Sequence, residues 1–144
     1  QRVLRLEKGH FIVGQDTDGL TQGFSAGLDG LVKLDKEDFV GKPELAWQHE
    51  RGDGPMLVGL RPHDGSIVPA EASQVLHRDG TIAGRVTSSR HSPTLGRSIC
   101  LAQLDRGLAA PGTSVRVRLP DGRDVTAEVT DRTHVDPEGD RQRV

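Results

Sequence analysis

Apolar and polar residues alternate most regularly near the end of the chain. In residues 115–119 and 125–129 every second position is apolar, and the turn Pro120-Asp121-Gly122 separates the two runs. A period of two is typical of strands with one buried face, and an Asp-Gly turn joins adjacent antiparallel strands. The residues expected to point inward are Val115, Val117, Val125, Ala127 and Val129, together with Ile99.

Further short apolar runs lie between residues 56 and 102. Residues 56–60 precede the turn His63-Asp64-Gly65, and residues 74–77 and 81–86 flank Arg78-Asp79-Gly80, which indicates a hairpin. About six short strands with Gly-rich turns and no crossover helices predict a mainly β fold. We expect a small antiparallel Greek-key-like barrel over residues 52–144.

The first part of the chain has a different pattern. Residues 1–34 are expected to be extended, with strands at 11–13 and 31–34, and a short helix is expected between about Lys36 and His49, with Pro43 in its first turn. The Gly, Asp and Pro residues at 51–55 indicate a boundary. We therefore expect an α+β segment, residues 1–51, which completes a larger domain, and a separate barrel domain, residues 52–144.

Composition narrows the classes of partner. Hydrophobic residues make up 33% of the 144 residues, charged residues make up 28%, and the net charge is −2. Without a basic excess or a long apolar run, the sequence favours neither nucleic acid nor membrane as a partner, and it favours a cytoplasmic location.

The chain offers no obvious catalytic or metal-binding motif. Cys100 lies in an apolar run and is expected to be a buried, inert thiol, and the six histidines do not show the spacings of zinc sites. Asp16-Thr17-Asp18-Gly19 resembles the start of a calcium loop but lacks its closing acid, so a solvated turn is expected. The hydroxyls near His91 are expected on opposite faces of a strand. We predict no catalytic residue and no metal ligand.

Several short phrases occur in an order that spans nearly the whole chain. They resemble the later half of glycine-cleavage T-protein-type folate enzymes. The phrases are Leu4-Arg5-Leu6-Glu7-Lys8-Gly9-His10, Val13-Gly14-Gln15-Asp16-Thr17-Asp18, Ala26-Gly27-Leu28, residues 36–42, Val86-Thr87-Ser88-Ser89, residues 92–102 and Asp136-Pro137-Glu138-Gly139.

This resemblance implies a function and a cofactor. Within the family, the Gln-Asp-Thr-Asp and Asp-Pro-Glu-Gly phrases are most similar to the C-terminal region of the alpha subunit of heterotetrameric sarcosine oxidase, with dimethylglycine dehydrogenase nearby. The expected function is that of the C-terminal portion of an aminomethyltransferase-type protein that binds tetrahydrofolate during one-carbon transfer from N-methyl amines or glycine derivatives. The family's catalytic aspartate lies upstream of the region that this chain resembles, and the fragment alone is expected to bind folate weakly or not at all.

The resemblance carries over one site residue. Arg5 matches an arginine of the folate pocket, where a fixed guanidinium pairs with a ligand carboxylate or a pocket acid. The alternative is an ion pair with Glu7 or another carboxylate that fixes the local backbone. Gly30 stands near the position where T-proteins commonly place a tryptophan that lines the folate cavity. Residues 92–96, Ser-Pro-Thr-Leu-Gly, are expected either to form a corner between two barrel strands or to line the folate cavity.

A second function stays open at this stage. The chain could be a non-catalytic β-barrel interaction module that docks on a partner subunit. In both cases the apolar residues of the first segment need covering, so we expect an upstream domain, another subunit or a second copy to pack on residues 1–50.

Overall fold

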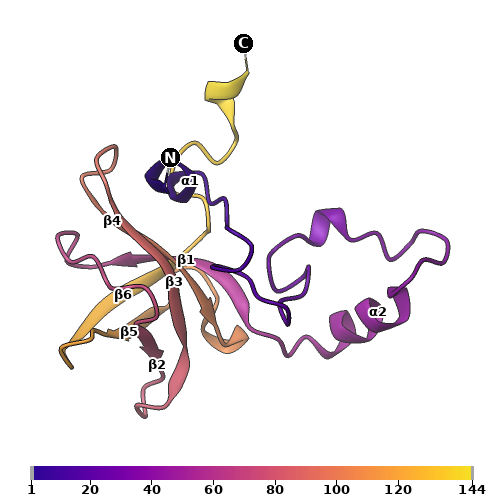
Figure 1. The fold of residues 1–144 in the computed structure, drawn as a ribbon, viewed down its shortest axis with the longest axis horizontal. Coiled ribbons are helices and arrows are strands. Elements are labelled where there is room, and N and C mark those ends of the chain that lie inside the picture. Colours follow the sequence, from indigo (N-terminus) through magenta and orange to yellow (C-terminus); the bar gives the residue numbers. More distant parts are fainter. Residues whose placement is uncertain (1, 144) are drawn as a thin grey trace.

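The alternating residues near the end of the chain form two strands of a closed barrel, as predicted. In the computed structural model, which describes residues 2–143, the strands are β1 (Met56–Pro62), β2 (Gln74–Leu76), β3 (Ile82–Ser92), β4 (Arg97–Leu104), β5 (Ser114–Arg118) and β6 (Asp124–Thr130). They pair antiparallel in the order β1-β4-β3-β2-β5-β6, and β6 closes the barrel on β1 (Figure 1). The order of β1 to β4 is a Greek key.

The barrel interior is filled by the inward residues of all six strands. Val115, Val117, Ala127 and Val129 are buried there, and Val125 packs against them partly buried, which confirms those predictions. Cys100 is also buried inside the barrel. Its burial raises the thiol pKa to about 12, in spite of a hydrogen bond to Ser89, so the thiol is inert.

The prediction that Ile99 points into the barrel is wrong. Ile99 is fully buried, but on the outer face of β4, where it packs with Leu6, Leu57 and Leu101. The cause is α1 (Arg2–Glu7), which covers that face and buries Leu6 against it. Because β4 is covered on both faces, its apolar run carries no alternation that could tell inside from outside.

The expected strands in residues 1–34 are also wrong. Residues 2–7 are helical, residues 13 and 17 make one isolated bridge, and η1 (Asp29–Leu31) is a single 3₁₀ turn. The remaining residues of this stretch form turns, because they lie outside the closed barrel and have no strand to pair with. The predicted helix is present as α2 (Lys42–Arg51), with Pro43 in its first turn and Gly52 in a left-handed conformation at its end.

Residues 28–53, which we call the arm, project from one side of the barrel and end in α2 (Figure 1). Two contacts hold the base of the arm: the Phe24 and His49 rings lie 4.5 Å apart, and the Leu57 amide donates to the Ser25 carbonyl at 2.8 Å. Two further 3₁₀ turns are η2 (Arg106–Leu108) and η3 (Asp140–Gln142). None of the described helices is long and apolar enough to cross a membrane.

Candidate functional site

Arg5 lies on the short helix that covers the barrel wall. Its neighbour Leu6 is 1% exposed and packs on Leu57, Ile99 and Leu101 of β1 and β4. This apolar contact fixes α1 on the sheet and places the Arg5 side chain beside β3, with 16% of it exposed.

The Arg5 guanidinium is held by three groups of the chain. One terminal nitrogen, Nη1, lies 2.5 Å from Asp16 Oδ2 and donates to the His10 carbonyl at 3.2 Å. The other, Nη2, donates to Ser88 Oγ at 2.7 Å. Arg5 therefore forms its ion pair with Asp16 and not with Glu7. The sequence analysis had left open which carboxylate pairs with Arg5.

Asp16 is the centre of this network. Its side chain is fully buried, and Oδ1 accepts hydrogen bonds from Thr87 Oγ1 and Ser88 Oγ, both at 2.6 Å. Oδ2 also accepts from the Ile12 amide at 2.8 Å. The prediction of a solvated turn is thus wrong for Asp16, although Asp18 does form an exposed turn that accepts from the Leu20 amide. We call Arg5, Asp16, Thr87 and Ser88 the Arg5 network.

The network decides the charge state of Asp16. Burial by itself raises the pKa of this carboxyl, but the bonds from the two hydroxyls, the Ile12 amide and Arg5 outweigh burial and lower the pKa below its usual value. Asp16 is therefore ionised at neutral pH, and the buried charge is matched by that of Arg5.

A β-bulge brings the two hydroxyls to one carboxylate. The register of β3 on β4 shifts between Val86 and Ser88, and both Thr87 and Ser88 are buried. In a regular strand, neighbouring side chains point to opposite faces, as the sequence led us to expect for these hydroxyls. The extra residue of a bulge changes that alternation, so both side chains reach Asp16.

Two glutamines bind the loop that carries Asp16 to the barrel strands. Gln15 Nε2 donates to Ser88 Oγ at 2.9 Å and to the Thr87 carbonyl at 3.1 Å. Gln103 Nε2 on β4 donates to the Asp16 carbonyl at 3.0 Å. The loop that carries Asp16 is thus attached to both β3 and β4.

Glu7 makes a separate link to the barrel. Ser92 Oγ, at the end of β3, donates to Glu7 Oε1 at 2.6 Å and accepts from the Leu95 amide at 3.1 Å. Residues 92–96 therefore form the β3–β4 corner that closes on α1, with Gly96 in a left-handed conformation. Glu7 acts as structural support.

The contacts above do not use every N–H group of the Arg5 guanidinium. Arginine has five N–H donors, and Arg5 uses three of them in the contacts above. Its Nε is buried with no partner among the described residues. A guanidinium that is fixed in this way is a preorganised group for a carboxylate or another polar acceptor.

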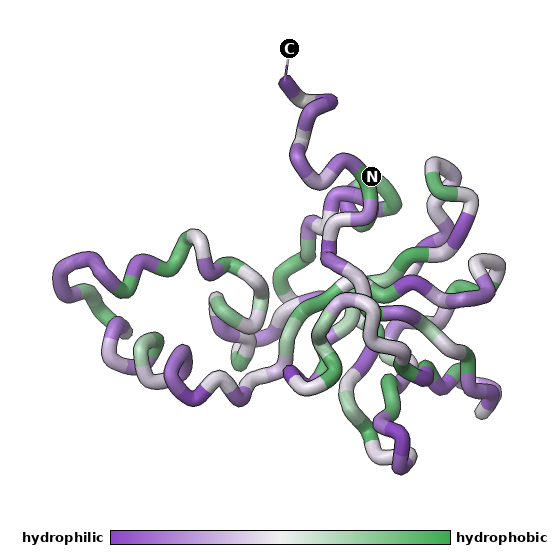
Figure 2. The backbone as a smooth tube through the Cα atoms, turned by 180° about the vertical axis from the view of Figure 1, so that it is seen from behind, coloured by the Kyte–Doolittle hydropathy of each residue, from purple (hydrophilic) through white to green (hydrophobic). Residues whose placement is uncertain are grey.

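The arm presents an apolar groove with a cavity volume of about 330 Å³. Its lining residues are Leu31, Val32, Lys33, Lys36, Phe39 and Leu45. Leu31 is 76% exposed, Val40 nearby is fully exposed, and Figure 2 shows hydrophobic stretches along the arm as well as in the barrel. Gly30, which precedes Leu31 in the chain, is exposed.

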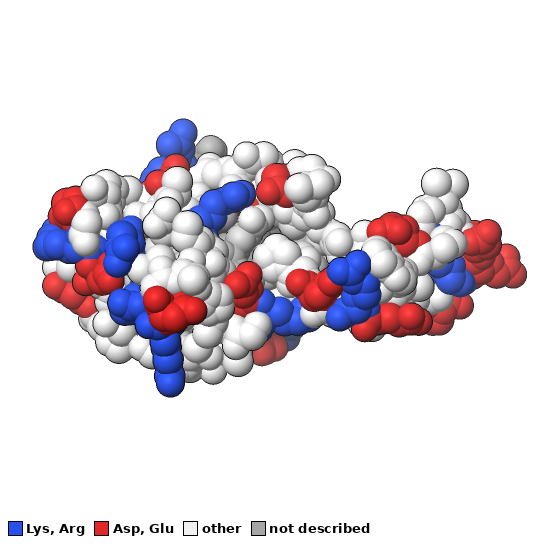
Figure 3. Space-filling view, turned by 90° about the horizontal axis from the view of Figure 1, so that it is seen from below, with Lys and Arg blue, Asp and Glu red and all other residues white. Residues whose placement is uncertain are grey.

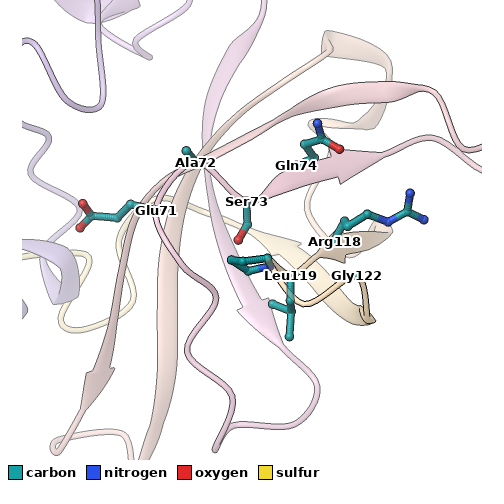
Figure 4. A pocket seen from close by; sticks show the side chains of 8 residues that line it. Glu71, Ala72, Ser73, Gln74, Arg118, Leu119 and Gly122 are labelled. Carbon is teal, nitrogen blue, oxygen red and sulfur yellow. The ribbon is translucent and has the colours of Figure 1, made fainter.

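A second depression, of about 440 Å³, lies where β2 and β5 separate beyond their three paired residues. Glu71, Ser73, Gln74, Arg118 and Leu119 line it (Figure 4). Arg118 is turned to Asp124, with Nε 2.8 Å from Oδ1, and Glu71 lies 3.0 Å from Arg90. Arg5 does not line this depression, so it is separate from the Arg5 network.

The comparisons with known proteins agree with the geometry of the barrel. The model of the family described as "Glycine cleavage T-protein C-terminal barrel domain" matches residues 56–136. An aminomethyltransferase of Saccharopolyspora erythraea is 43% identical over 116 residues, which cover 80% of this chain and 31% of that protein. A sarcosine oxidase subunit alpha of Corynebacterium sp. strain U-96 is 37% identical over 148 residues, which cover 97% of this chain and 15% of that protein.

A solved structure shows the same fold. The glycine cleavage system aminomethyltransferase T from Bartonella henselae superposes with a TM-score of 0.85, at 23% identity, over 93% of this chain and 37% of that one. The chain therefore spans about a third or less of the length of these relatives.

Proposed function

The chain belongs to the glycine cleavage T-protein family through its C-terminal barrel domain, and from that premise we propose that it works as the C-terminal portion of a tetrahydrofolate-dependent aminomethyltransferase-type protein. The proposed type is that of sarcosine oxidase alpha. Its role is one-carbon transfer from N-methyl amines or glycine derivatives. The chemistry and the flavin and NAD sites of such a protein lie outside this chain.

The observation that carries the sarcosine oxidase assignment is the extent of the match. The similarity to the Corynebacterium alpha subunit covers 97% of this chain, which includes the arm and the C-terminal phrase. The similarity to the Saccharopolyspora aminomethyltransferase covers 80%.

Arg5 is the residue that we propose for contact with folate. Its charge is fixed beside the barrel wall by Asp16 and Ser88, and one N–H of Nη2 is not used by the contacts described above. Tetrahydrofolate carries carboxylates and a polar pterin, both of which a fixed guanidinium can bind.

The arm is the proposed contact with the rest of the protein. Its groove is apolar, and residues 28–53 carry seven acidic and four basic side chains, with the acidic ones gathered toward the free end (Figure 3). Exposed apolar surface of this kind is normally covered in a soluble protein. We propose that an upstream folate-binding domain, which residues 1–51 complete, covers the groove.

The chain alone is expected to bind tetrahydrofolate weakly or not at all. Binding sites surround most of their ligand, and this chain supplies one fixed guanidinium and part of a wall. Isothermal titration calorimetry of residues 1–144 tests this prediction. Low-micromolar binding by these residues alone would show that the proposed division of the site is wrong.

The alternative function is an interaction module that docks on a partner subunit or on a second copy through the arm. The exposure of Leu31, Val40 and Trp47 favours this reading as much as the first. The reading frame upstream of residue 1 discriminates between the two. A T-protein-like region encoded there supports the folate function, whereas an isolated frame supports the module.

A further inference from the structure

Two arginines lie on the paired strands β1 and β4, near the ends of those strands that meet at Pro62. Arg61 is on β1, and Arg97 is the first residue of β4. The Arg97 Nη2 atom donates to the carbonyl of Pro62, the residue after Arg61, at 2.6 Å. Gly65 packs against the Arg97 stem so closely that a Cβ there would lie 2.8 Å from Arg97 Cβ. Arg97 is therefore held in place by the loop that follows β1.

His134 lies near these arginines, because it contacts Cys100, which pairs with Leu60, the residue before Arg61. Its segment is fixed because the His134 and Val135 amides donate to the Glu7 carbonyl at 2.9 and 2.8 Å, and its Nε2 is 3.4 Å from the Cys100 carbonyl. Burial is the main reason that the pKa of His134 is lowered, the Cys100 contact opposes this, and the charges of Arg61 and Arg97 lower the pKa further.

The positive charge of this cluster is only partly matched. Arg61 Nη2 lies 3.0 Å from Glu128 Oε2. Arg97 forms no ion pair within residues 2–143, and its Nε is buried with no partner among them. A partly buried cation without a counter-charge is unfavourable, and an added anion offsets that cost.

We propose that Arg97, Arg61 and His134 form a binding site for a small oxyanion, the phosphate or carboxylate group of a small molecule. Nη1 of Arg97 and the second N–H of Nη2 have no partner among the described residues, and these two donors match two oxygens of such a group. Arg61 and His134 are close enough to Arg97 for the charges of both arginines to act on the imidazole. This site is independent of the proposed folate function. Arg5 is bound to Asp16, and the cluster shares no side chain with the Arg5 network.

The test is an NMR titration of the histidines of the full chain in sulfate, against sodium chloride of equal ionic strength. Sulfate does not titrate over the range used, so only the protein changes charge. A bound anion favours the protonated imidazole, and we expect the His134 pKa to rise by about 0.5 unit or more in sulfate. The other five histidines report non-specific screening. A His134 shift no larger than theirs overturns the proposal.

Variants locate the anion. Arg97→Gln is expected to abolish the sulfate-dependent shift, and Arg97→Lys is expected to reduce it while keeping the charge. The control is Arg123→Gln, because Arg123 is 70% exposed and is bound to Asp121 in the turn between β5 and β6. If the sulfate shift is unchanged in both Arg97 variants, the site is wrong. If Arg97→Gln fails to fold, Arg97→Lys and the wild-type comparison decide the question.

Discussion

The Asp16→Ala variant is expected to lower the free energy of unfolding by about 3–5 kcal/mol. The substitution removes the acceptor of four hydrogen bonds and leaves Arg5 as an unmatched charge against the barrel wall. Thr87 and Ser88 also lose the partner that their buried hydroxyls share. Urea denaturation followed by circular dichroism measures the loss.

Asp18→Ala is the matched control for this variant. Asp18 is two residues away, its side chain is 44% exposed, and its contact with Arg85 is 3.5 Å long. Its removal is expected to change stability by about 1 kcal/mol or less. A loss for Asp16→Ala no larger than that of Asp18→Ala would mean that the Arg5 network does not fix the loop.

The same carboxylate predicts a pH dependence. Because the pKa of Asp16 is lower in the folded state than the ordinary value of 3.8, its stabilising contribution is complete above that value and disappears as the pH falls through the folded-state pKa. Wild-type stability should therefore fall more steeply below about pH 4 than that of Asp16→Ala.

Gly59→Ala is expected to cost about 3 kcal/mol or more, because it forces the closing seam of the barrel apart. Gly59 pairs with Leu101 on one side and Thr130 on the other. A Cβ at this position would lie only 2.2 Å from the Asp131 carbonyl oxygen, which is backbone and cannot turn away. The melting temperature measured by calorimetry reports the change.

Gly107→Ala is the control for the seam. Gly107 lies in η2 with open space around its Cβ position, so alanine is accommodated there. Equal melting temperatures for the two variants would contradict the described closure of β1 on β6.

The barrel could be predicted because its signals are local. Two Asp-Gly turns join the paired strands at residues 76–82 and 118–124, and the alternation at 115–129 identifies the inner face. Each signal needs only neighbouring residues along the chain. The short helix with Pro43 was predictable for the same reason.

The outer face of β4 and the first 34 residues needed information that lies far apart in sequence. Leu6 covers Ile99 across more than 90 residues, and a six-residue helix is too short to show a period. The apolar residues at 11–13 and 31–34 have strand-like composition, but the barrel is already closed without them.

Of the Arg5 network, only Arg5 and its need for an acidic partner could be predicted from the sequence. The resemblance identified Arg5, and the chemistry of arginine required an acidic partner. Asp16 as that partner, and the bulge that turns both Thr87 and Ser88 toward it, depend on the register of β3 on β4. In the sequence, the adjacent hydroxyls of Thr87 and Ser88 were the feature that could have indicated this contact. They reach the same carboxylate only because the strand contains a bulge, which the sequence does not show.

The most direct test of the proposed role of Arg5 is the tetrahydrofolate affinity of the polypeptide that includes the upstream region, compared between wild type and Arg5→Lys by titration calorimetry. Lysine keeps the charge beside Asp16 but lacks the planar fork, so the fold is retained and the contact with the ligand is weakened. We predict an affinity about tenfold lower, with a melting temperature close to that of the wild type and no change in an Arg123→Lys control. An unchanged affinity in a folded Arg5→Lys protein would contradict a role for Arg5 in folate binding.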